Sequence, residues 1–110
     1  MALDPELAER VADLVTGRPG MSSRRMFGGL AWLVNGNMAV AIRGQGGLLV
    51  RVDPDRHEEL LAEPGTDTMI MRGRELTGWM TVNAQACDSE AGLTAWVDRG
   101  LDYAGALPPK

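Results

Sequence analysis

The chain has 110 residues, of which 45% are apolar and 24% are charged, and its formal net charge is −4 at pH 7. One cysteine and one histidine exclude an intramolecular disulfide and a zinc site built from thiolates and imidazoles. The longest apolar runs, at residues 30–34 and 38–42, are too short to cross a membrane, and the first residues lack the apolar core of a secretory signal, so we expect a cytoplasmic protein without membrane contact.

The N-terminal segment predicts an amphipathic helix. Asp4 before Pro5 is typical of a helix cap followed by proline at the first helical position. Apolar residues then recur at helical spacing between residues 7 and 15. We expect the helix to end near Gly17, because glycine favours helix termination.

Residues 22–52 show the alternation that is typical of strands. We predict strands at residues 30–34, 38–42 and 48–52, preceded by a short strand at 23–26. The turn Asn35-Gly36-Asn37 favours a hairpin, because Asn and Gly tolerate positive φ. A two-residue loop would divide the apolar residues between both faces, whereas a three-residue loop would set Val34 opposite Met38 and place one apolar set on a single face: Leu30, Trp32, Val34, Met38, Val40 and Ile42. We favour the three-residue loop.

The second half of the chain repeats both patterns. Asp53-Pro54 predicts a short acidic helix at residues 55–62, and two more strands are expected at 68–71 and 79–82, joined by a loop at 72–78. Ser89 is expected to cap a last helix with one apolar stripe, formed by Leu93, Trp96, Val97, Leu101 and Ala104. The order α-β-β-β-α-β-β-α, with room for one extra strand, predicts a single α+β domain over residues 1–110. It has two layers, an antiparallel sheet of five to six strands with helices on one face.

Charge follows the predicted elements. Residues 18–52 carry five arginines and no acidic residue, whereas residues 53–67 carry six acidic residues and one arginine. This pattern would either place a positive patch on the open sheet face or bring the basic strands beside the acidic helices. The candidate ligand or partner contacts are arginines beside the strands and nearby aromatic residues: Arg24, Arg25, Phe27, Arg72, Arg74 and Trp79. Solvated strand faces or salt bridges to the acidic helices are the favoured interpretation.

The methionines allow two interpretations. Five of the seven, with two tryptophans, could line an adaptable apolar surface: Met26, Met38, Met69, Met71, Met80, Trp32 and Trp79. Because the chain has one phenylalanine, we expect these side chains mostly to fill the core.

No catalytic set emerges from the sequence. His57 is the single imidazole, and on a short surface helix a packed or solvated histidine is favoured over a general base. Cys87 precedes the last helix, where its thiol could be reactive, although a small packing residue is favoured. We therefore expect no enzyme, no cofactor and no metal site, and a small enzyme that uses Cys87 is the least favoured alternative.

The chain resembles the N-terminal domain of the TfoX (Sxy) family in a motif shortly after the first helix, Arg25-Met26-Phe27-Gly28-Gly29. Supporting matches follow in the Asn-Gly hairpin and then along the rest of the chain: Arg51-Val52-Asp53, Met71-Arg72-Gly73-Arg74, Gly78-Trp79, Trp96-Val97, Tyr103-Ala104 and Leu107-Pro108. The resemblance implies a two-layer α+β fold related to the secretion-chaperone-like architecture, and a link to the regulation of natural competence for DNA uptake. Full-length competence regulators of this family carry a second, C-terminal helical domain, so the resemblance implies a stand-alone form here. The family offers no catalytic residues to transfer.

These observations favour a non-enzymatic regulatory or protein-interaction module of a bacterial protein. We expect an exposed sheet face or strand edge to bind a partner protein of unknown identity, and we expect a homodimer. The alternative is nucleic-acid binding through the arginine-bearing strands, which a pI of about 4.9 and few aromatic residues disfavour.

Overall fold

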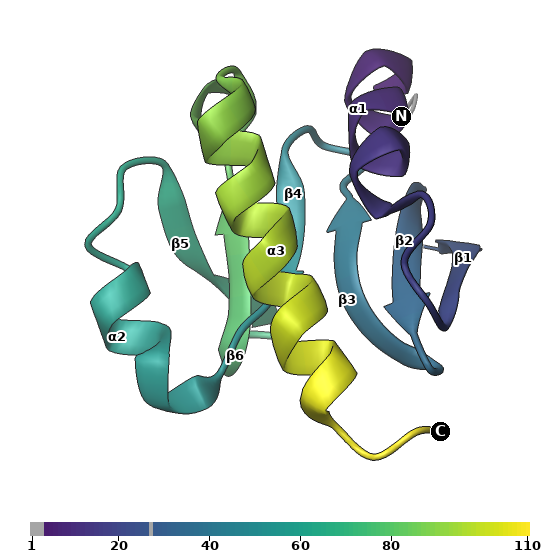
Figure 1. The fold of residues 1–110 in the computed structure, drawn as a ribbon. Helices are drawn as coiled ribbons and strands as arrows, with labels where there is room; N and C mark the ends of the chain where they lie inside the picture. Colours follow the sequence, from purple (N-terminus) through teal and green to yellow (C-terminus); the bar gives the residue numbers. More distant parts are fainter. Residues whose placement is uncertain (1–3, 27) are drawn as a thin grey trace.

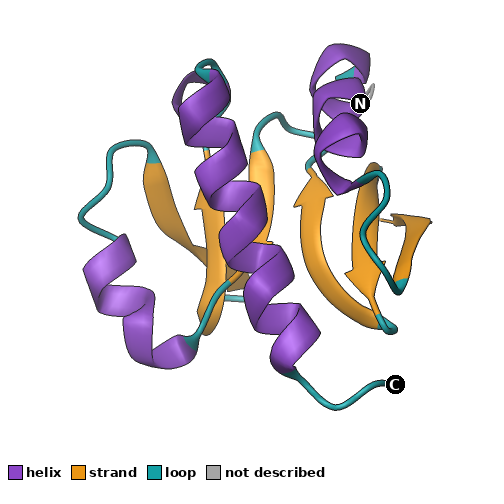
Figure 2. Cartoon of the chain, viewed as in Figure 1, coloured by secondary structure: helices purple, strands orange, loops and turns teal. Residues whose placement is uncertain are grey.

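The protein folds as one antiparallel sheet with its helices gathered on one face (Figures 1 and 2). The computed structural model describes residues 4–26 and 28–110. Its sheet has six strands in the order β1-β2-β3-β4-β6-β5, and every neighbouring pair is antiparallel. The strands are β1 (Met21–Met26), β2 (Gly29–Val34), β3 (Asn37–Ile42), β4 (Leu48–Arg51), β5 (Thr66–Met71) and β6 (Arg74–Val82). The predicted α+β class and element order are confirmed, with the extra strand present.

Two long helices begin where the sequence predicts. In α1 (Pro5–Val15), the Asp4 carboxylate accepts a hydrogen bond from the Leu7 amide at 3.2 Å. In α3 (Glu90–Ala106), the Ser89 hydroxyl accepts one from the Gly92 amide at 3.0 Å. A short helix, α2 (His57–Leu60), follows the 3₁₀ turn η1 (Pro54–Arg56), and a second 3₁₀ turn, η2 (Gln85–Cys87), precedes α3. No helix in the described part of the chain is both long and apolar enough to cross a membrane.

The β2–β3 hairpin corrects the predicted register. Its loop has two residues, Asn35 and Gly36, both with positive φ (51° and 85°), so that Val34 pairs with Asn37 instead of Met38. Two-residue loops of this kind match the twist of paired strands. Farther from the turn, Trp32 pairs with Val40, and the one extra residue in β3 forms a bulge. The bulge keeps the apolar set of residues 30–34 on the helix side, as predicted, but turns Met38 to the opposite face.

The β5–β6 hairpin also differs from the prediction. The expected loop at residues 72–78 is a two-residue turn at Arg72 and Gly73, and β6 begins at once with Arg74. The irregularity lies farther along, where Thr68 pairs with Met80 but the next residue of β5 pairs with Leu76. Three residues of β6, 77–79, are therefore additional at this point. This register step allows the distal half of the hairpin to bend away from the plane of the sheet.

The core lies between the helices and one face of the sheet. All five residues of the predicted α3 stripe are buried, and they join residues of α1, α2 and the strands in one apolar cluster. Gly100 brings α3 close to the β3 bulge: a Cβ atom at this position would lie 2.6 Å from the carbonyl oxygen of Ala39. Helix and strand therefore meet at backbone distance, which fixes how α3 lies on the sheet.

Candidate functional site

The face of the sheet opposite the helices carries an apolar hollow of about 450 Å³. In Figure 1 the helices lie in front of the sheet, and the hollow is on the other side. Its apolar lining comes from five strands: Met26, Met38, Leu49, Met69, Met71, Leu76 and Trp79. The volume falls within the range of about 300 to 1,000 Å³ that is typical of ligand pockets.

Strand alternation explains why this lining is so apolar. Across the sheet, Ala31 pairs with Ala41, Ala41 with Leu49, and Leu49 with Thr81, so these residues share one face. Their neighbours along each strand, such as Val40 and Val50, are completely buried under the helices. Several strands are therefore apolar on both faces, although helices cover only one of them.

The bent β5–β6 hairpin forms one wall of the hollow. Met69 and Met71 on β5 and Leu76 on β6 line it together with Met26, which comes from β1 at the opposite edge of the sheet. Met71 is 42% exposed. The predicted interpretation of the methionines is therefore wrong in part: Met80 and Trp32 are core residues, but four other methionines and Trp79 line an open surface.

None of the four candidate arginines lines the hollow, and three of them lie around it. Arg24 and Met26 alternate on β1 and share the uncovered face, whereas Arg25 pairs with Leu30 and lies on the helix side. Arg74 pairs with Met71, and Arg72 is in the turn between them. The four predicted arginines are all exposed, and none is among the residues that line the hollow.

One charged residue that the prediction passed over does line the hollow. Arg43 follows β3 and borders the apolar surface together with Gln45. Asp67 and Glu75 lie near it, on a second hollow that Arg43 also borders. The sequence signal for Arg43 was its position directly after an apolar strand, in a segment without acidic residues.

Trp79 is held in place by a cation–π contact. The Arg51 guanidinium lies 5.0 Å from the centre of the Trp79 ring and 5.8 Å from that of Tyr103. Arg51 and Trp79 are also register partners between β4 and β6. This arginine is therefore engaged by aromatic rings, while Trp79 presents part of its surface to the hollow.

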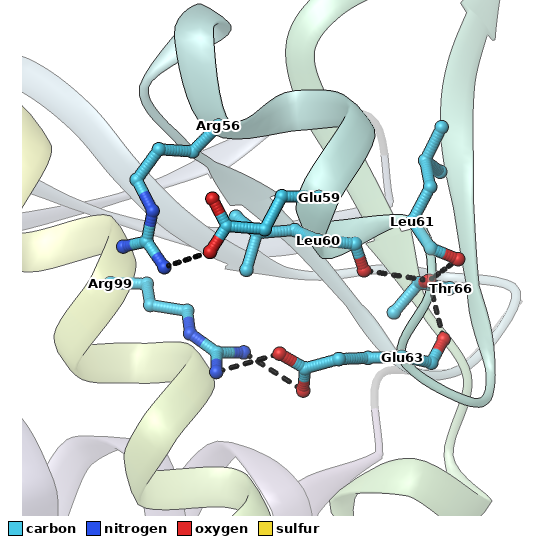
Figure 3. Close-up of polar contacts among 7 residues, drawn as sticks. All are labelled: Arg56, Glu59, Leu60, Leu61, Glu63, Thr66 and Arg99. Carbon is cyan, nitrogen blue, oxygen red and sulfur yellow. Dashed lines mark hydrogen bonds and ion pairs between the residues drawn. The ribbon is translucent and has the colours of Figure 1, made fainter.

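Ion pairs gather on the helix side of the molecule. Arg99 of α3 pairs with Glu63 at 2.7 Å, and Arg56 pairs with Glu59 at 3.1 Å. Figure 3 shows both pairs next to the Thr66 hydroxyl, which donates a hydrogen bond to the carbonyl oxygen of Glu63 after α2. A further pair joins α3 to the segment after α1, between Arg18 and Asp98. Among the described residues, no ion pair involves the arginines that surround the hollow, which are Arg24, Arg43, Arg72 and Arg74.

The single histidine is a structural residue. His57 is 5% exposed, its Nδ1 accepts a hydrogen bond from the Gly78 amide at 2.9 Å, and its Nε2 lies 2.8 Å from the Thr68 hydroxyl. Because Nδ1 accepts, the ring proton is on Nε2 and is donated to Thr68. The imidazole thus connects α2 to both strands of the bent hairpin at the register step.

The single cysteine is also a packing residue. Cys87 is buried in the core cluster, and burial raises the pKa of its thiol to about 11. A thiol of this kind carries little thiolate near neutral pH. Within residues 4–26 and 28–110, no group of three His, Cys, Asp or Glu side chains is arranged to hold a metal ion.

A comparison with known protein families shows to which family the chain belongs. Residues 13–104 match the model of the TfoX N-terminal domain. The chain belongs to the TfoX N-terminal domain family. A search of curated proteins found no match to it.

The motif that suggested the TfoX family borders the hollow. Met26 ends β1 and lines the hollow, Gly28 has a φ of 75°, and Gly29 pairs with Met26 at the start of β2. At Gly29 a Cβ atom would collide with the carbonyl oxygen of Ile42 in β3, so the TfoX motif needs glycine there. The predicted contact Phe27 lies outside the described residues.

Proposed function

We propose that this TfoX N-terminal domain is a non-enzymatic binding module, and that the hollow on its uncovered sheet face takes apolar side chains of a partner protein. The observation that carries the proposal is the apolar lining of about 450 Å³ on a face that no helix of the described chain covers. Exposed apolar patches rimmed by polar residues are typical of interaction sites.

The methionine content of the hollow suits such a role. Four of its lining residues are methionines, whose unbranched, polarisable side chains adapt to differently shaped partners. The hairpin wall adds exposed apolar area, since Met71 is 42% exposed. A partner that covers this wall would remove both the hollow and the hairpin surface from water.

The geometry of the two residues considered for catalysis supports a binding role over an enzymatic one. Both ring nitrogens of His57 are engaged inside the fold, and the Cys87 thiol is buried. A catalytic base or nucleophile must reach a substrate, and neither side chain lines the hollow.

A homodimer, a cytoplasmic location and a regulatory role stay predictions. The two edge strands, β1 and β5, leave backbone groups free for pairing with a second copy, although charged residues on β1 oppose this. Sedimentation equilibrium of the wild-type chain at micromolar concentrations decides the point: we expect a dimer, and a monomer at all concentrations would remove that prediction.

The binding function is tested in two steps. First, a photo-reactive amino acid at Leu76 of β6, which lines the hollow, should cross-link a partner protein in cells, and the purified partner should then bind the wild-type chain in solution. The second step compares two adjacent residues of β5. Met71→Glu places a charge in the hollow and should weaken this binding at least tenfold, an effect of about 1.4 kcal/mol. Ile70→Glu makes the same change at an adjacent, more exposed position outside the lining of the hollow and should weaken it much less.

Both positions are exposed, so both variants should fold. Circular dichroism and thermal unfolding check this directly. Equal binding by Met71→Glu and the wild-type chain would refute the proposed site, as would equal losses in both variants.

A further inference from the structure

We infer that the segment bound in the hollow is an acidic amphipathic helix of the partner protein. This inference rests on the proposed binding function and adds the chemistry of the partner. It is drawn from the distribution of charge around the hollow and from the type of element that an uncovered sheet face accommodates.

The charges around the hollow favour an acidic segment. Arg43 lines the hollow, and no acidic side chain is among the described residues that do so. Arg24 shares this face from the β1 side, and Arg74 shares it from the hairpin side, beside Met71. In the described chain none of these guanidinium groups has a carboxylate partner, so each can pair with a carboxylate of a ligand.

The distribution of acidic residues strengthens the argument. The net charge of −4 arises with acidic residues concentrated outside residues 18–52, and all observed ion pairs involve the helices or the segments that flank them. The exceptions are Asp67, which ends the cross-strand row that begins at Arg24, and Glu75, which borders the second hollow together with Asp67 and Arg43. An acidic ligand should therefore place its carboxylates toward Arg24 and Arg74 and away from Asp67 and Glu75.

The shape of the surface favours a helix. Helices bury an apolar stripe on a sheet face, as α3 does on the covered side of this sheet. An amphipathic helix presents apolar side chains at positions i, i+3, i+4 and i+7, which suits a hollow lined by several strands. An extended segment would instead pair with the backbone of an edge strand, and its binding would not depend on the side chains of the hollow.

A second copy of the chain fits this surface poorly. Two sheets stacked face to face about a two-fold axis that runs across the strands would bring Arg24 of one copy toward Arg24 of the other. Like charges set against each other across an interface oppose association. A nucleic acid would match the charge, but the hollow offers methionine side chains where a base-stacking surface needs flat aromatic rings.

The test uses three fluorescein-labelled model peptides of equal length and the full chain. The first has leucine at helical i, i+3, i+4, i+7 spacing and glutamate elsewhere, the second has lysine in place of every glutamate, and the third is the acidic peptide with its leucine spacing scrambled. Fluorescence anisotropy at low salt should show that the first peptide binds roughly tenfold more tightly than either of the others. Unlabelled single-stranded DNA is added as a competitor, and it should not displace the first peptide.

Two adjacent arginines provide matched variants. Arg24→Glu reverses a charge on the uncovered face and should weaken binding of the acidic peptide several-fold while it strengthens binding of the basic one. Arg25→Glu makes the same change one residue along β1, on the helix side, and should alter neither. Both residues are exposed, so both variants should fold.

The outcomes separate this inference from the proposed function. Equal binding of the acidic and basic peptides, equal effects of the two arginine variants, or displacement by DNA would overturn the inference. So would a cross-linked partner that binds through the hollow with a basic or extended segment, although the proposed function would then stand. A partner whose binding ignores Met71→Glu would instead refute the proposed function.

Discussion

The two faces of the sheet use the same strands for different purposes. On the covered face, branched and aromatic side chains pack against three helices, and the surrounding charges are paired at distances such as 2.6 Å and 2.7 Å. On the uncovered face, methionines line a hollow, and the neighbouring arginines have no carboxylate partner within the described residues. Alternation along one strand can therefore place tightly packed side chains on one face of a sheet and an open apolar surface on the other.

The largest expected effect separates two methionines on opposite faces. Met80 is completely buried under the helices, so Met80→Ala should lower the free energy of unfolding by about 3 kcal/mol, through lost burial and a cavity. Met38 is half-buried in the open hollow, and Met38→Ala should cost less than about 1 kcal/mol. Denaturant unfolding measures both. Equal losses would mean that the hollow is part of the core.

A smaller effect concerns the residue that ties the hairpin to the covered side. His57→Ala leaves the Gly78 amide without its acceptor and should cost about 2 kcal/mol. Glu58→Ala, at the adjacent exposed position, should change stability by no more than about 0.5 kcal/mol. Hydrogen exchange should locate the His57 effect, with faster exchange at Gly78 and along β5. Faster exchange spread evenly over the whole sheet would contradict a local role for the His57 hydrogen bonds.

Two glycines of α3 provide a finer comparison. A Cβ atom at Gly100 would lie 2.6 Å from the backbone of Ala39, so Gly100→Ala should lose about 1 kcal/mol or more despite the better helix propensity of alanine. At Gly105 the nearest atom would be 3.6 Å away, and Gly105→Ala should gain about 0.5 kcal/mol. Thermal unfolding compares the two. A gain at both positions would show that α3 does not press on the β3 bulge.

The last effect appears only at high pH. Burial raises the pKa of Cys87 to about 11, from an ordinary value of about 9. The unfolded chain therefore releases the thiol proton at a lower pH than the folded chain, so this contribution to stability is complete below about pH 9 and is lost as pH rises toward 11. The free energy of unfolding of the wild-type chain should fall more steeply over this range than that of Cys87→Ala. Parallel curves would mean that the thiol is exposed.

Local signals explain which parts of the fold the sequence predicts well. The caps at Asp4 and Ser89 and the α3 stripe depend on residues within a few positions of one another, and the structure confirms all three. The family motif was also readable from the sequence, although only Gly28 answers a need of the local backbone, through its positive φ, whereas Gly29 makes room for the carbonyl oxygen of Ile42 on the neighbouring strand.

The hollow depends on contacts between distant residues, which is why the sequence favoured a core role for its methionines over the open surface that they line. Met38 faces the hollow because of a bulge in β3 that packs against Gly100, far along the chain. Met69 and Met71 reach it because the hairpin bends at a register step, where His57 bonds to Gly78, 21 positions later. The alternation of apolar residues within each strand predicts neither the bulge in β3 nor the bend of the hairpin, since both depend on tertiary packing.

The four thioethers of the hollow also make it chemically addressable. Peroxide converts methionine to its sulfoxide, a polar group that dedicated reductases can restore. Met26, Met38, Met69 and Met71 border open space, whereas Met80 is sealed in the interior. Mild oxidation followed by mass spectrometry should therefore modify these four sulfur atoms faster than that of Met80, and a molecule bound in the hollow would protect them.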